Sequence, residues 1–409
     1  MQAGLLNTGT ELLAGDVQDT HLAFIAREIF PLGLRIAERR TVGDGTVIGE
    51  ALKELFSRGE IIFVTGGLGP TSDDITRDVT AELLGLKLKE DAELLTSLKQ
   101  RLRARGIKWV ESIARQAQVP ERAKVLPNAN GSAPGLYLTA NVNPRIPSPH
   151  IFLLPGPPRE LQPMFRDHTM SILRSIIKGA PAVERRFYKI AVMGESVIEE
   201  KIGKKILTIP GIELGYCARP GEVDLRIIGA RSKLEQAHEI IRAELGESIF
   251  AEDDRSIEEV LVERLTEKKK TLATAESCTG GLLANRITNV AGSSKVLVAG
   301  YVTYANEAKI DILGVDPDTL EKHGAVSEEV ARAMAEGARK RARSTYALAT
   351  TGIAGPDGGS EEKPVGTVYV TLAGENETKV KKLFFPSDRE TFKQLVAQFA
   401  FEMLRRELI

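Results

Sequence analysis

The sequence is poor in cysteine, histidine and aromatic residues. Its 409 residues include two cysteines, five histidines and one tryptophan, and aromatic residues make up 5% of the chain. The two cysteines, Cys217 and Cys278, fall in different regions, so we expect free thiols in a reducing compartment and no disulfide framework. The side chain of Cys278 is expected to point into the core.

The sequence also lacks an excess of charge of one sign and any long apolar run. Lysine and arginine number 55, aspartate and glutamate number 56, and the formal net charge is −1. This balance gives no electrostatic reason to expect a nucleic-acid or membrane partner. No apolar run approaches the roughly 20 residues that a membrane-spanning helix needs, and the N-terminus has no basic stretch followed by an apolar one. We therefore expect a cytoplasmic protein.

The length and the breaks in the chain predict three domains. A chain of 409 residues is long enough for two or three. A helix expected over residues 169–178 ends at Gly179-Ala-Pro181, and the next strong helix start is the capping box Ser256-Ile-Glu-Glu259. The predicted domains are residues 1–178, 179–253 and 254–409.

The last domain contains a segment with the components of an acyl-transfer site. Residues 275–281 read Ala-Glu-Ser-Cys-Thr-Gly-Gly and lie at an expected strand-to-helix turn. Ser277 can attack a carbonyl group, and the backbone N–H groups behind it, at Thr279, Gly280 and Gly281, are expected to be free to hold an oxyanion. This segment predicts an amide or ester hydrolase.

A serine nucleophile needs a base, and two residues can be considered. His323 is the only histidine after residue 250, but a helix is expected to end beside it at Gly324, which favours a cap or loop role. A lysine can serve instead if burial lowers its pKa enough to leave it neutral. Lys309 is that candidate, because it lies one turn inside a helix that Asn306 could cap.

A glycine-rich turn stands near the front of the chain. The apolar strand Ile61–Thr65 is followed by Gly-Gly-Leu-Gly-Pro-Thr-Ser-Asp-Asp over residues 66–74 and then by a helix. Gly66, Gly67 and Gly69 can cradle a phosphate, although neither the P-loop pattern nor the dinucleotide-binding pattern is present.

Two carboxylates follow these glycines. Asp73 and Asp74 would repel a pyrophosphate unless a divalent cation lay between, so the pair indicates bound magnesium or a similar ion. The alternative is that an aspartate caps the following helix. We expect Asp73 to be the cap, and for Asp74 both roles stay open.

Two further segments are expected in the same cavity. Thr10 and Glu11 follow the first strand, and Asp44 follows the next. Open α/β sheets bind ligands at the carboxyl ends of their parallel strands. We therefore expect these three residues to lie beside the glycine-rich turn.

Five ordered motifs in the last third resemble one family. They are residues 275–281, Ala291-Gly-Ser-Ser294, Tyr304-Ala-Asn-Glu-Ala-Lys309, Thr351-Gly-Ile-Ala-Gly-Pro-Asp357 and Pro364-Val-Gly-Thr-Val368. Together they closely resemble the α/β C-terminal domain of the CinA family, the competence/damage-inducible proteins. The resemblance implies a nicotinamide mononucleotide amidohydrolase, which releases nicotinate mononucleotide and ammonia and needs no cofactor.

The resemblance also implies roles for individual residues. Ser277 is implied as the nucleophile and Lys309 as its base, with Tyr304 nearby. Ser294 is the competing serine, and which of the two attacks stays open. Its loop is typical of a helix-to-strand connection, which favours substrate binding over attack.

A mononucleotide substrate carries a 5′-phosphate, so this site needs anion donors. Gly352, Gly355 and the run 357–360 can present backbone N–H groups. Arg389, at an expected helix start, can make a two-pronged contact to phosphate and matches a motif position of the family. The alternative for residues 355–360 is a flexible surface turn.

The front part resembles the MoaB/MogA-like molybdopterin-binding domain, a parallel-sheet fold, as it occurs in CinA proteins. The glycine-rich turn and the segment Leu154-Pro-Gly-Pro-Pro-Arg-Glu160, which contains Gly156, carry this resemblance. It implies that Asp44 and Asp74 serve metal and pyrophosphate chemistry, and that the domain hydrolyses ADP-ribose with a divalent metal. A proline and a threonine follow the last glycine of the turn, which makes molybdopterin itself the less expected ligand.

The middle part is predicted to be a small α+β domain. Strand, helix, strand, strand and helix are expected over residues 187–192, 195–204, 212–217, 222–230 and 233–244. This order resembles the KH-like linker domain of the family. The segment Gly203-Lys-Lys-Ile206 lacks the second glycine with which KH modules clamp RNA, so we expect a spacer and packing surface.

The sequence therefore predicts an α/β enzyme with two active sites for pyridine nucleotide recycling. Its substrates would be small nucleotides, nicotinamide mononucleotide at the rear and ADP-ribose at the front, and the chain is expected to form a homo-oligomer, a dimer. The alternative is an accessory protein of competence that binds a molybdopterin-type ligand.

Overall fold

The computed structural model describes residues 1–104, 106, 108–177, 179 and 183–409. The chain divides into two compact units, Met1–Val183 and Glu184–Ile409, and each is described by itself. The helix end expected at Lys178 and the break expected at Ala180 and Pro181 lie outside the described residues. The division into three domains therefore stays a prediction. No helix among the described residues is long and apolar enough to cross a membrane.

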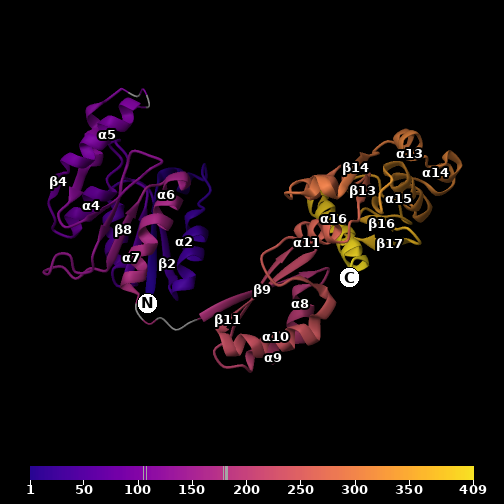
Figure 1. Ribbon diagram of the computed structural model, residues 1–409, viewed down its shortest axis with the longest axis horizontal. Coiled ribbons are helices and arrows are strands. Elements are labelled where there is room, and N and C mark those ends of the chain that lie inside the picture. The colour runs from indigo at the N-terminus through magenta and orange to yellow at the C-terminus, as the bar shows by residue number, and fades with distance from the viewer. Residues whose placement is uncertain (105, 107, 178, 180–182) are drawn as a thin grey trace. The chain divides into compact units, whose positions relative to one another are not determined.

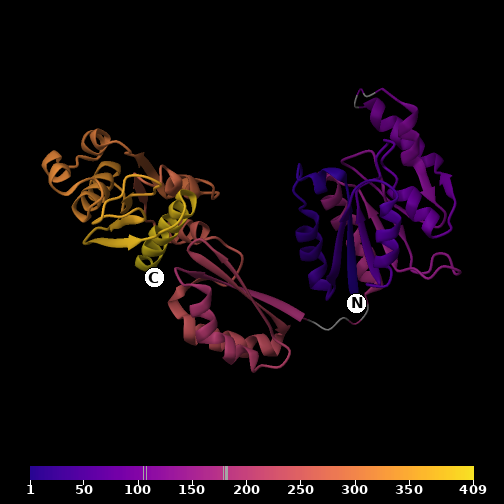
Figure 2. The same cartoon turned by 180° about the vertical axis from the view of Figure 1, so that it is seen from behind.

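A six-stranded sheet with helices on both faces forms the first unit (Figures 1 and 2). The order is β2-β1-β3-β8-β7-β6. The strands β2, β1, β3 and β8 are parallel to one another, and β7 runs antiparallel to both of its neighbours, β8 and β6. The strands are β1 (Gln2–Thr8), β2 (Arg35–Val42), β3 (Ile61–Thr65), β6 (Lys124–Leu126), β7 (Gly135–Leu138) and β8 (His150–Leu154), and a separate hairpin pairs β4 (Leu88–Glu90) with β5 (Gln118–Pro120). The predicted parallel sheet is confirmed.

The central strands of this sheet are apolar on both faces, as a sheet covered on both sides requires. The helices are α1 (Thr10–Ala14), α2 (His21–Ile29), α3 (Val47–Leu55), α4 (Thr76–Leu83), α5 (Ala92–Ala104), α6 (Pro158–Met164) and α7 (Met170–Ile176). Phe63 packs with α2, α6 and α7 on one face, and its neighbour Ile62 packs with α3 on the other. Because β2, β1, β3 and β8 are parallel, the loops that follow these strands lie at the same edge of the sheet.

The second unit begins with a four-stranded sheet of order β10-β11-β9-β12. Its strands are β9 (Val183–Ala191), β10 (Glu213–Arg219), β11 (Glu222–Ala230) and β12 (Ile249–Ala251). The helices α8 (Glu195–Ile198) and α9 (Lys204–Leu207), joined by a π-helical turn, and α10 (Arg231–Leu245) share one apolar core with these strands. The predicted strands and helices are present with shifted ends, and β12 was not predicted.

A five-stranded sheet of order β14-β13-β15-β16-β17 completes the second unit. The strand β13 (Leu272–Glu276) is parallel to β14 (Leu297–Val302) and β15 (Tyr346–Gly352). The strand β16 (Thr367–Ala373) runs antiparallel to both of its neighbours, β15 and β17 (Thr378–Phe384). One face packs against α11 (Ile257–Glu267), α12 (Leu282–Thr288) and α16 (Arg389–Glu407), and the other against α13 (Asn306–Leu313), α14 (Pro317–His323) and α15 (Glu328–Ala342). The capping box that begins α11 is confirmed.

Two predicted helix caps are wrong. No side chain caps α4, and the residue before its first turn is Ile75, so Asp73 lies too early in the loop to serve. Asn306 is already the first helical residue of α13, and the preceding cap position belongs to Ala305. A capping side chain must stand on the residue before the helix begins, so neither polar residue is in register to cap.

Candidate functional site

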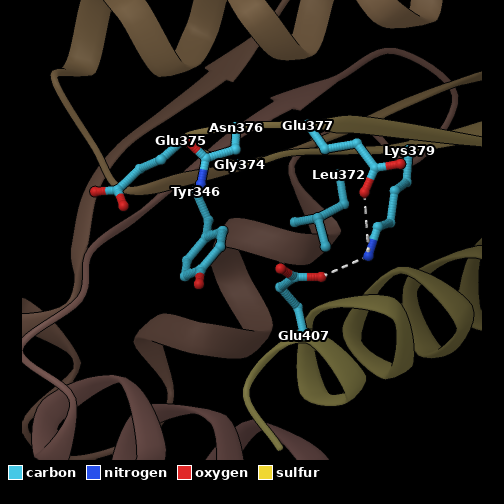
Figure 3. A pocket seen from close by; sticks show the side chains of 8 residues that line it. All are labelled: Tyr346, Leu372, Gly374, Glu375, Asn376, Glu377, Lys379 and Glu407. Atoms are coloured by element: carbon cyan, nitrogen blue, oxygen red, sulfur yellow. Dashed lines mark hydrogen bonds and ion pairs between the residues drawn. The ribbon is translucent and has the colours of Figure 1, made fainter.

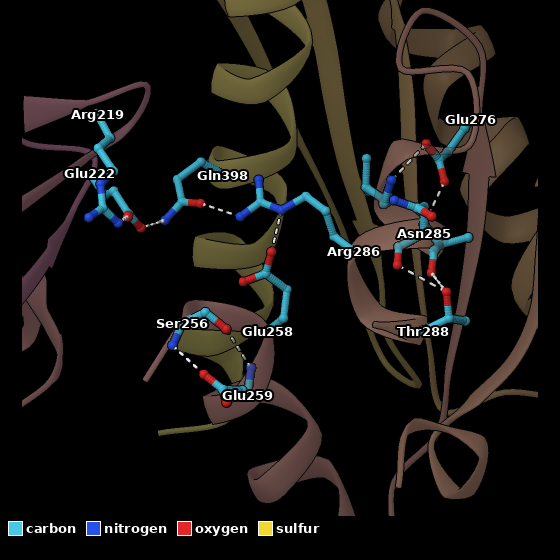
Figure 4. Close-up of polar contacts among 12 residues, drawn as sticks. Arg219, Glu222, Ser256, Glu258, Glu259, Glu276, Asn285, Arg286, Thr288 and Gln398 are labelled. Atoms are coloured by element: carbon cyan, nitrogen blue, oxygen red, sulfur yellow. Dashed lines mark hydrogen bonds and ion pairs between the residues drawn. The ribbon is translucent and has the colours of Figure 1, made fainter. Parts of the chain in front are cut away.

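A buried carboxylate shapes the turn that carries Ser277. The side chain of Glu276, the last residue of β13, is fully buried. Its oxygens accept hydrogen bonds from the N–H groups of Gly281, Leu283 and Ala284 at 2.9 to 3.0 Å. Figure 4 shows the Glu276 side chain. The carboxylate therefore occupies the N-terminus of α12, where the helix dipole favours negative charge.

This arrangement corrects the expectation of free N–H groups on the two glycines. The Gly281 N–H is bonded to the buried carboxylate, and the Gly280 N–H donates to the carbonyl oxygen of Ser277 at 3.1 Å. Both glycines have positive φ, 62° and 94°, so the turn needs them for its shape. The N–H groups of Cys278 and Thr279 have no backbone or carboxylate acceptor among the described residues, which leaves them as the candidate oxyanion donors.

Ser277 is half-buried, and the side chains of the next two residues, Cys278 and Thr279, are too buried to contact a substrate. Cys278 lies in the apolar core, as predicted, and burial raises the pKa of its thiol to about 12. A protonated thiol is a poor nucleophile. The Thr279 hydroxyl is fully buried and lies 2.7 Å from both the Glu276 carboxylate and the Thr350 hydroxyl, so its predicted substrate contact can come only from its backbone.

Lys309 is a buried residue of α13, and its amine lies at the end of β14, the strand next to β13. Its Nζ donates to the carbonyl oxygens of Thr303 and Tyr304 at 3.0 and 3.1 Å, and the Thr303 N–H donates to the Glu276 carbonyl oxygen at 2.9 Å. The amine therefore lies beside the strand end that leads into Ser277. No hydrogen bond joins Lys309 Nζ to Ser277 Oγ within the described residues.

The surroundings of this amine favour its neutral form. Burial lowers the pKa of Lys309 below the ordinary lysine value. A third carbonyl oxygen lies 3.5 Å from Nζ, which is too long for a strong hydrogen bond. Two acceptors therefore hold the amine, and a neutral amine can satisfy both.

Arg389, the first residue of α16, joins predicted residues from separate segments. Its Nη1 donates to the Gly355 carbonyl oxygen and its Nη2 to the Tyr304 hydroxyl, each at 2.8 Å. Gly355 thus acts as an acceptor here, whereas we expected it to present its N–H group. A guanidinium group has five N–H donors, so three are left for a phosphate.

The other predicted anion donors lie outside these contacts. Gly352 is the last residue of β15 and pairs with Val368 in the sheet. Residues 357–360 form an exposed turn, in which the Ser360 N–H donates to the Lys363 carbonyl oxygen.

A cavity of about 440 Å³ adjoins the first turns of α12 and α16. It is lined by Leu282, Arg389, Glu390, Lys393 and Gln394. Lys393, which was not predicted from the sequence, lies one turn after Arg389, and its Nζ is 3.9 Å from the position that a Cβ atom on Gly280 would take. Two cations therefore flank the turn. Their spacing of four residues at a helix start was the available signal.

Two residues considered from the sequence lie elsewhere. Ser294 is exposed in the short turn Ser293–Lys295 between α12 and β14, the predicted helix-to-strand connection. His323 ends α14 before Gly324, as expected, and its Nδ1 lies 3.3 Å from the Glu329 carboxylate. No hydrogen bond or ion pair joins either residue to the Ser277 turn in the part of the chain that the structure describes.

A cavity of about 350 Å³ gathers the predicted front residues at the carboxyl ends of the parallel strands. It is lined by Glu11, Asp44, Gly66, Gly67, Gly69, Asp73, Asp74 and Gly156, all of which were predicted. Thr10 supports this lining, because its N–H and hydroxyl donate to the Asp44 carboxylate at 2.9 and 3.0 Å. Gln116, Ser132 and Glu160 also line the cavity and were not predicted.

The front cavity is acidic. Five carboxylates line it, and no lysine or arginine of the described residues does. The Asp74 carboxylate accepts the Thr71 N–H at 3.0 Å and packs against Gly69, where a Cβ atom would come within 2.4 Å of it. A hydrogen bond from Thr71 lowers the pKa of Asp73. An anionic ligand would be repelled here unless a cation accompanied it.

The donor set suits a divalent cation that shares its coordination with a ligand. No three acidic, histidine or cysteine side chains of the described chain cluster closely enough to hold a metal by themselves. Mg²⁺ is usually bound by one or two carboxylates, by phosphate oxygens and by water. Asp44 and Asp74 line the cavity and fit this arrangement.

A smaller cavity of about 170 Å³ contains none of the predicted residues (Figure 3). It lies beside the β16–β17 hairpin and the end of α16. Lys379 is 3.6 Å from Glu377 and 2.8 Å from Glu407, so its charge is paired within the cavity. This hollow therefore adds nothing to either site.

Comparison with known proteins gives matches along the whole chain. A family model described as "CinA C-terminal domain" matches residues 254–408, and one described as "Probable molybdopterin binding domain" matches residues 4–175. A CinA-like protein from Akkermansia muciniphila is 42% identical over 398 residues, 97% of this chain and 95% of that protein. A protein from Caldicellulosiruptor bescii, named for competence and damage induction, is 40% identical over 417 residues, 100% of both. A crystal structure of a competence/damage-inducible protein from Agrobacterium tumefaciens is 42% identical and covers 38% of this chain and 96% of its own, with a TM-score of 0.36.

Proposed function

Because the chain belongs to the CinA family, with a MoaB-like domain in front and a CinA-type domain at its rear, we propose two hydrolytic activities. The rear site converts nicotinamide mononucleotide to nicotinate mononucleotide and ammonia. The front site splits ADP-ribose to AMP and ribose 5-phosphate with a divalent cation. The observation that carries the rear assignment is the convergence of the Ser277 turn, the buried amine of Lys309 and the two cations at the start of α16.

The rear reaction begins with attack by the serine. Ser277 Oγ bonds to the carboxamide carbon of the substrate, and its proton passes to the neutral amine of Lys309. The negative charge that develops on the carboxamide oxygen is stabilised by the free N–H groups behind Ser277. Lys309 then gives the proton to the amide nitrogen, the C–N bond breaks and ammonia leaves.

Water completes the cycle. The first half leaves a nicotinoyl ester on Ser277, and Lys309 takes a proton from the water that attacks this ester. The ester bond breaks, the serine regains its proton and a carboxylate product departs. The serine and the lysine thus account for both halves without a metal.

The phosphate of the substrate is bound by the first turn of α16. Arg389 is held by Gly355 and Tyr304 and keeps three N–H donors, and Lys393 places a second positive charge beside the Ser277 turn. A helix N-terminus adds favourable backbone dipoles for an anion.

The front activity depends on the acidic cavity. Asp44 and Asp74 would hold the divalent cation, which neutralises pyrophosphate charge when bound. Gly66 and Gly67 line the cavity with backbone, and the turn requires glycine at Gly67, because a Cβ atom there would lie 2.0 Å from Thr76 Oγ1. The chain therefore supplies a close backbone surface and the cation ligands.

A molybdopterin-type ligand is the second candidate for the front cavity, because residues 4–175 match the molybdopterin-binding family model. It would make the front domain a binding module, and the chain an accessory protein in which this domain performs no hydrolysis.

Product analysis with the purified full chain tests these assignments. With nicotinamide mononucleotide we expect ammonia and nicotinate mononucleotide in amounts unaffected by a chelator. With ADP-ribose we expect AMP and ribose 5-phosphate, which disappear when the chelator is present. Absence of ammonia would reject the rear assignment, and absence of AMP at every metal tested would leave the binding role for the front cavity.

A further inference from the structure

A buried glutamine joins the two helices that frame the rear site. Gln398 of α16 is 1% exposed. Its Oε1 accepts a hydrogen bond from Arg286 Nη2 of α12 at 2.8 Å, and its Nε2 donates to Glu222 Oε2 at 3.0 Å (Figure 4). Both ends of one amide are therefore used, and Glu222 belongs to the β10–β11 hairpin of the preceding sheet.

Each of these helices begins at the rear site. The first turn of α12 is bound by the carboxylate that shapes the Ser277 turn, and Arg286 lies one turn further along. The first turn of α16 carries Arg389 and Lys393, and Gln398 follows on the same helix. The bond between Arg286 and Gln398 therefore fixes the spacing between the nucleophile turn and the two cations.

The hairpin is in direct contact with this link. Gly221, at the tip, has a φ of 78°, and a Cβ atom there would lie 2.7 Å from Gln398 Cβ. The Gly221 carbonyl oxygen accepts the Val192 N–H at 2.9 Å, which ties the tip to the end of β9. On the other side, Arg286 is also paired with the Glu258 carboxylate. The tip is thus held between its own sheet and the helices of the rear domain.

We propose that the β10–β11 hairpin, through Glu222 and Gln398, positions the first turns of α12 and α16 and so sets the affinity of the rear site for its phosphorylated substrate. Glu222 and Gln398 are positioning residues, because neither lines the cavity beside α16. The predicted middle domain, to which this hairpin belongs, then supports the geometry of the rear site in addition to the spacer role that its sequence suggests. The kinetic part of this proposal rests on the proposed amidohydrolase activity.

A charge swap in the full chain tests it. Gln398→Glu places two carboxyl groups at the 3.0 Å contact with Glu222, and at a pH where both are ionised their repulsion displaces α16. We expect the KM for nicotinamide mononucleotide to rise about fivefold to thirtyfold, with kcat within about twofold of wild type because the Glu276 carboxylate still holds the first turn of α12 and the Ser277 turn. Adding Glu222→Gln should restore the KM, since the amide introduced at position 222 donates to the carboxylate introduced at position 398, which still accepts from Arg286.

Hydrogen exchange supplies a readout that does not depend on the substrate. Backbone amides of residues 392–396, the first in α16 with helical carbonyl acceptors, should exchange faster in Gln398→Glu and return to the wild-type rate in the double variant. Gln236→Glu and Glu239→Gln, on the exposed face of α10, are matched controls that should change neither KM nor exchange.

The results of these experiments distinguish failure of the positioning role from failure of the proposed amidohydrolase activity. If the wild-type chain releases no ammonia, the amidohydrolase assignment fails, and hydrogen exchange alone decides the positioning role. An unchanged KM and exchange rate in Gln398→Glu, or a double variant no better than the single one, overturns the proposal. Should Gln398→Glu not fold, Glu222→Ala removes the hairpin's half of the link, and a wild-type KM in that variant overturns the proposal equally.

Discussion

At the scale of the residue, the proposed rear reaction depends on the protonation state of Lys309. Burial lowers its pKa, and the proposed base is the neutral amine. The rate of ammonia release should therefore rise as pH rises through a pKa below the roughly 10.4 of a free lysine. The unfolded chain binds this proton more tightly, so the contribution of Lys309 to stability also increases with pH between the folded and unfolded pKa values. The pH profile of kcat/KM is the measurement.

Lys309→Met is the matched variant for that profile, because it keeps the length of the side chain and removes the amine. Its residual activity should be low and lack the rise with pH. A normal profile in this variant would mean that another group takes the proton from Ser277.

The phosphate contacts make a separate prediction. Arg389→Ala removes a charged hydrogen-bond donor, which should weaken binding of the mononucleotide by about 1.5 to 3 kcal/mol, or roughly 10- to 150-fold in KM. Lys393→Ala should act in the same direction, because its Nζ lies beside Gly280. Nicotinamide riboside, which lacks the phosphate, is the control substrate. Equal losses for both substrates would assign these residues to the shape of the site and not to phosphate binding.

The sequence indicated those candidate residues that lie in short motifs. Ser277, Lys309 and Arg389 became candidates because a turn, a helix start and a family motif marked them. Lys393 and Gln116 were missed, because only the folded chain brings them to the glycines that they approach or to the cavity that they line.

At the scale of the element, the turn between β13 and α12 depends on one buried charge. Glu276→Gln keeps the shape of the side chain but replaces an acceptor oxygen with an N–H₂ group that cannot accept from the helix N-terminus. We expect a loss of about 1 to 3 kcal/mol in the free energy of unfolding, with a fall in kcat because the nucleophile turn loosens. Denaturant unfolding and steady-state ammonia release are the measurements.

Glu267→Gln, at the exposed end of α11, is the control and should change neither quantity. If Glu276→Gln matched this control, the carboxylate would have no special role in the turn.

Elements with a strong pattern were predicted well, and their ends were not. Strand Ile61–Thr65 was recognised from its apolar run, and α11 from its capping box. The cap predicted at Asp73 failed because the loop continues to Ile75 before α4 begins, and the carboxylate interacts with Thr71 instead. Local hydrogen bonds within a loop compete with capping, and sequence alone does not show which of them forms.

At the scale of the whole molecule, the chain carries two cavities of opposite character. The front cavity is lined by carboxylates, and the rear one is flanked by Arg389 and Lys393. Each candidate site has its own residues within its own unit, so the two proposed activities should be separable by mutation.

Asp74→Asn tests this separation. It keeps the shape of the side chain and removes one charge, so metal-dependent cleavage of ADP-ribose should be lost while ammonia release is unchanged. Both products are measured on the same preparation, with Asp16→Asn, an exposed residue beyond α1, as the control. Normal ADP-ribose cleavage by Asp74→Asn would reduce this aspartate to its hydrogen bonds with Thr71 and remove the metal assignment.

The long-range contacts of the predicted middle domain could not be predicted from the sequence. Its strands and helices could be read from their patterns, and a spacer role was the natural interpretation. The contact of Gly221 with Gln398 joins residues 177 positions apart, and no local pattern in either segment indicates it.

The proposed rear reaction begins with attack of Ser277 on the carboxamide of nicotinamide mononucleotide. Steady-state ammonia release from this substrate, compared between Ser277→Ala and Ser294→Ala, is the decisive measurement. We expect Ser277→Ala to lose nearly all turnover yet still bind the mononucleotide, because Arg389 and Lys393 are untouched, and Ser294→Ala to keep its turnover with at most a raised KM. Full activity in Ser277→Ala together with none in Ser294→Ala would reject Ser277 as the nucleophile and move that role to the turn Ser293–Lys295.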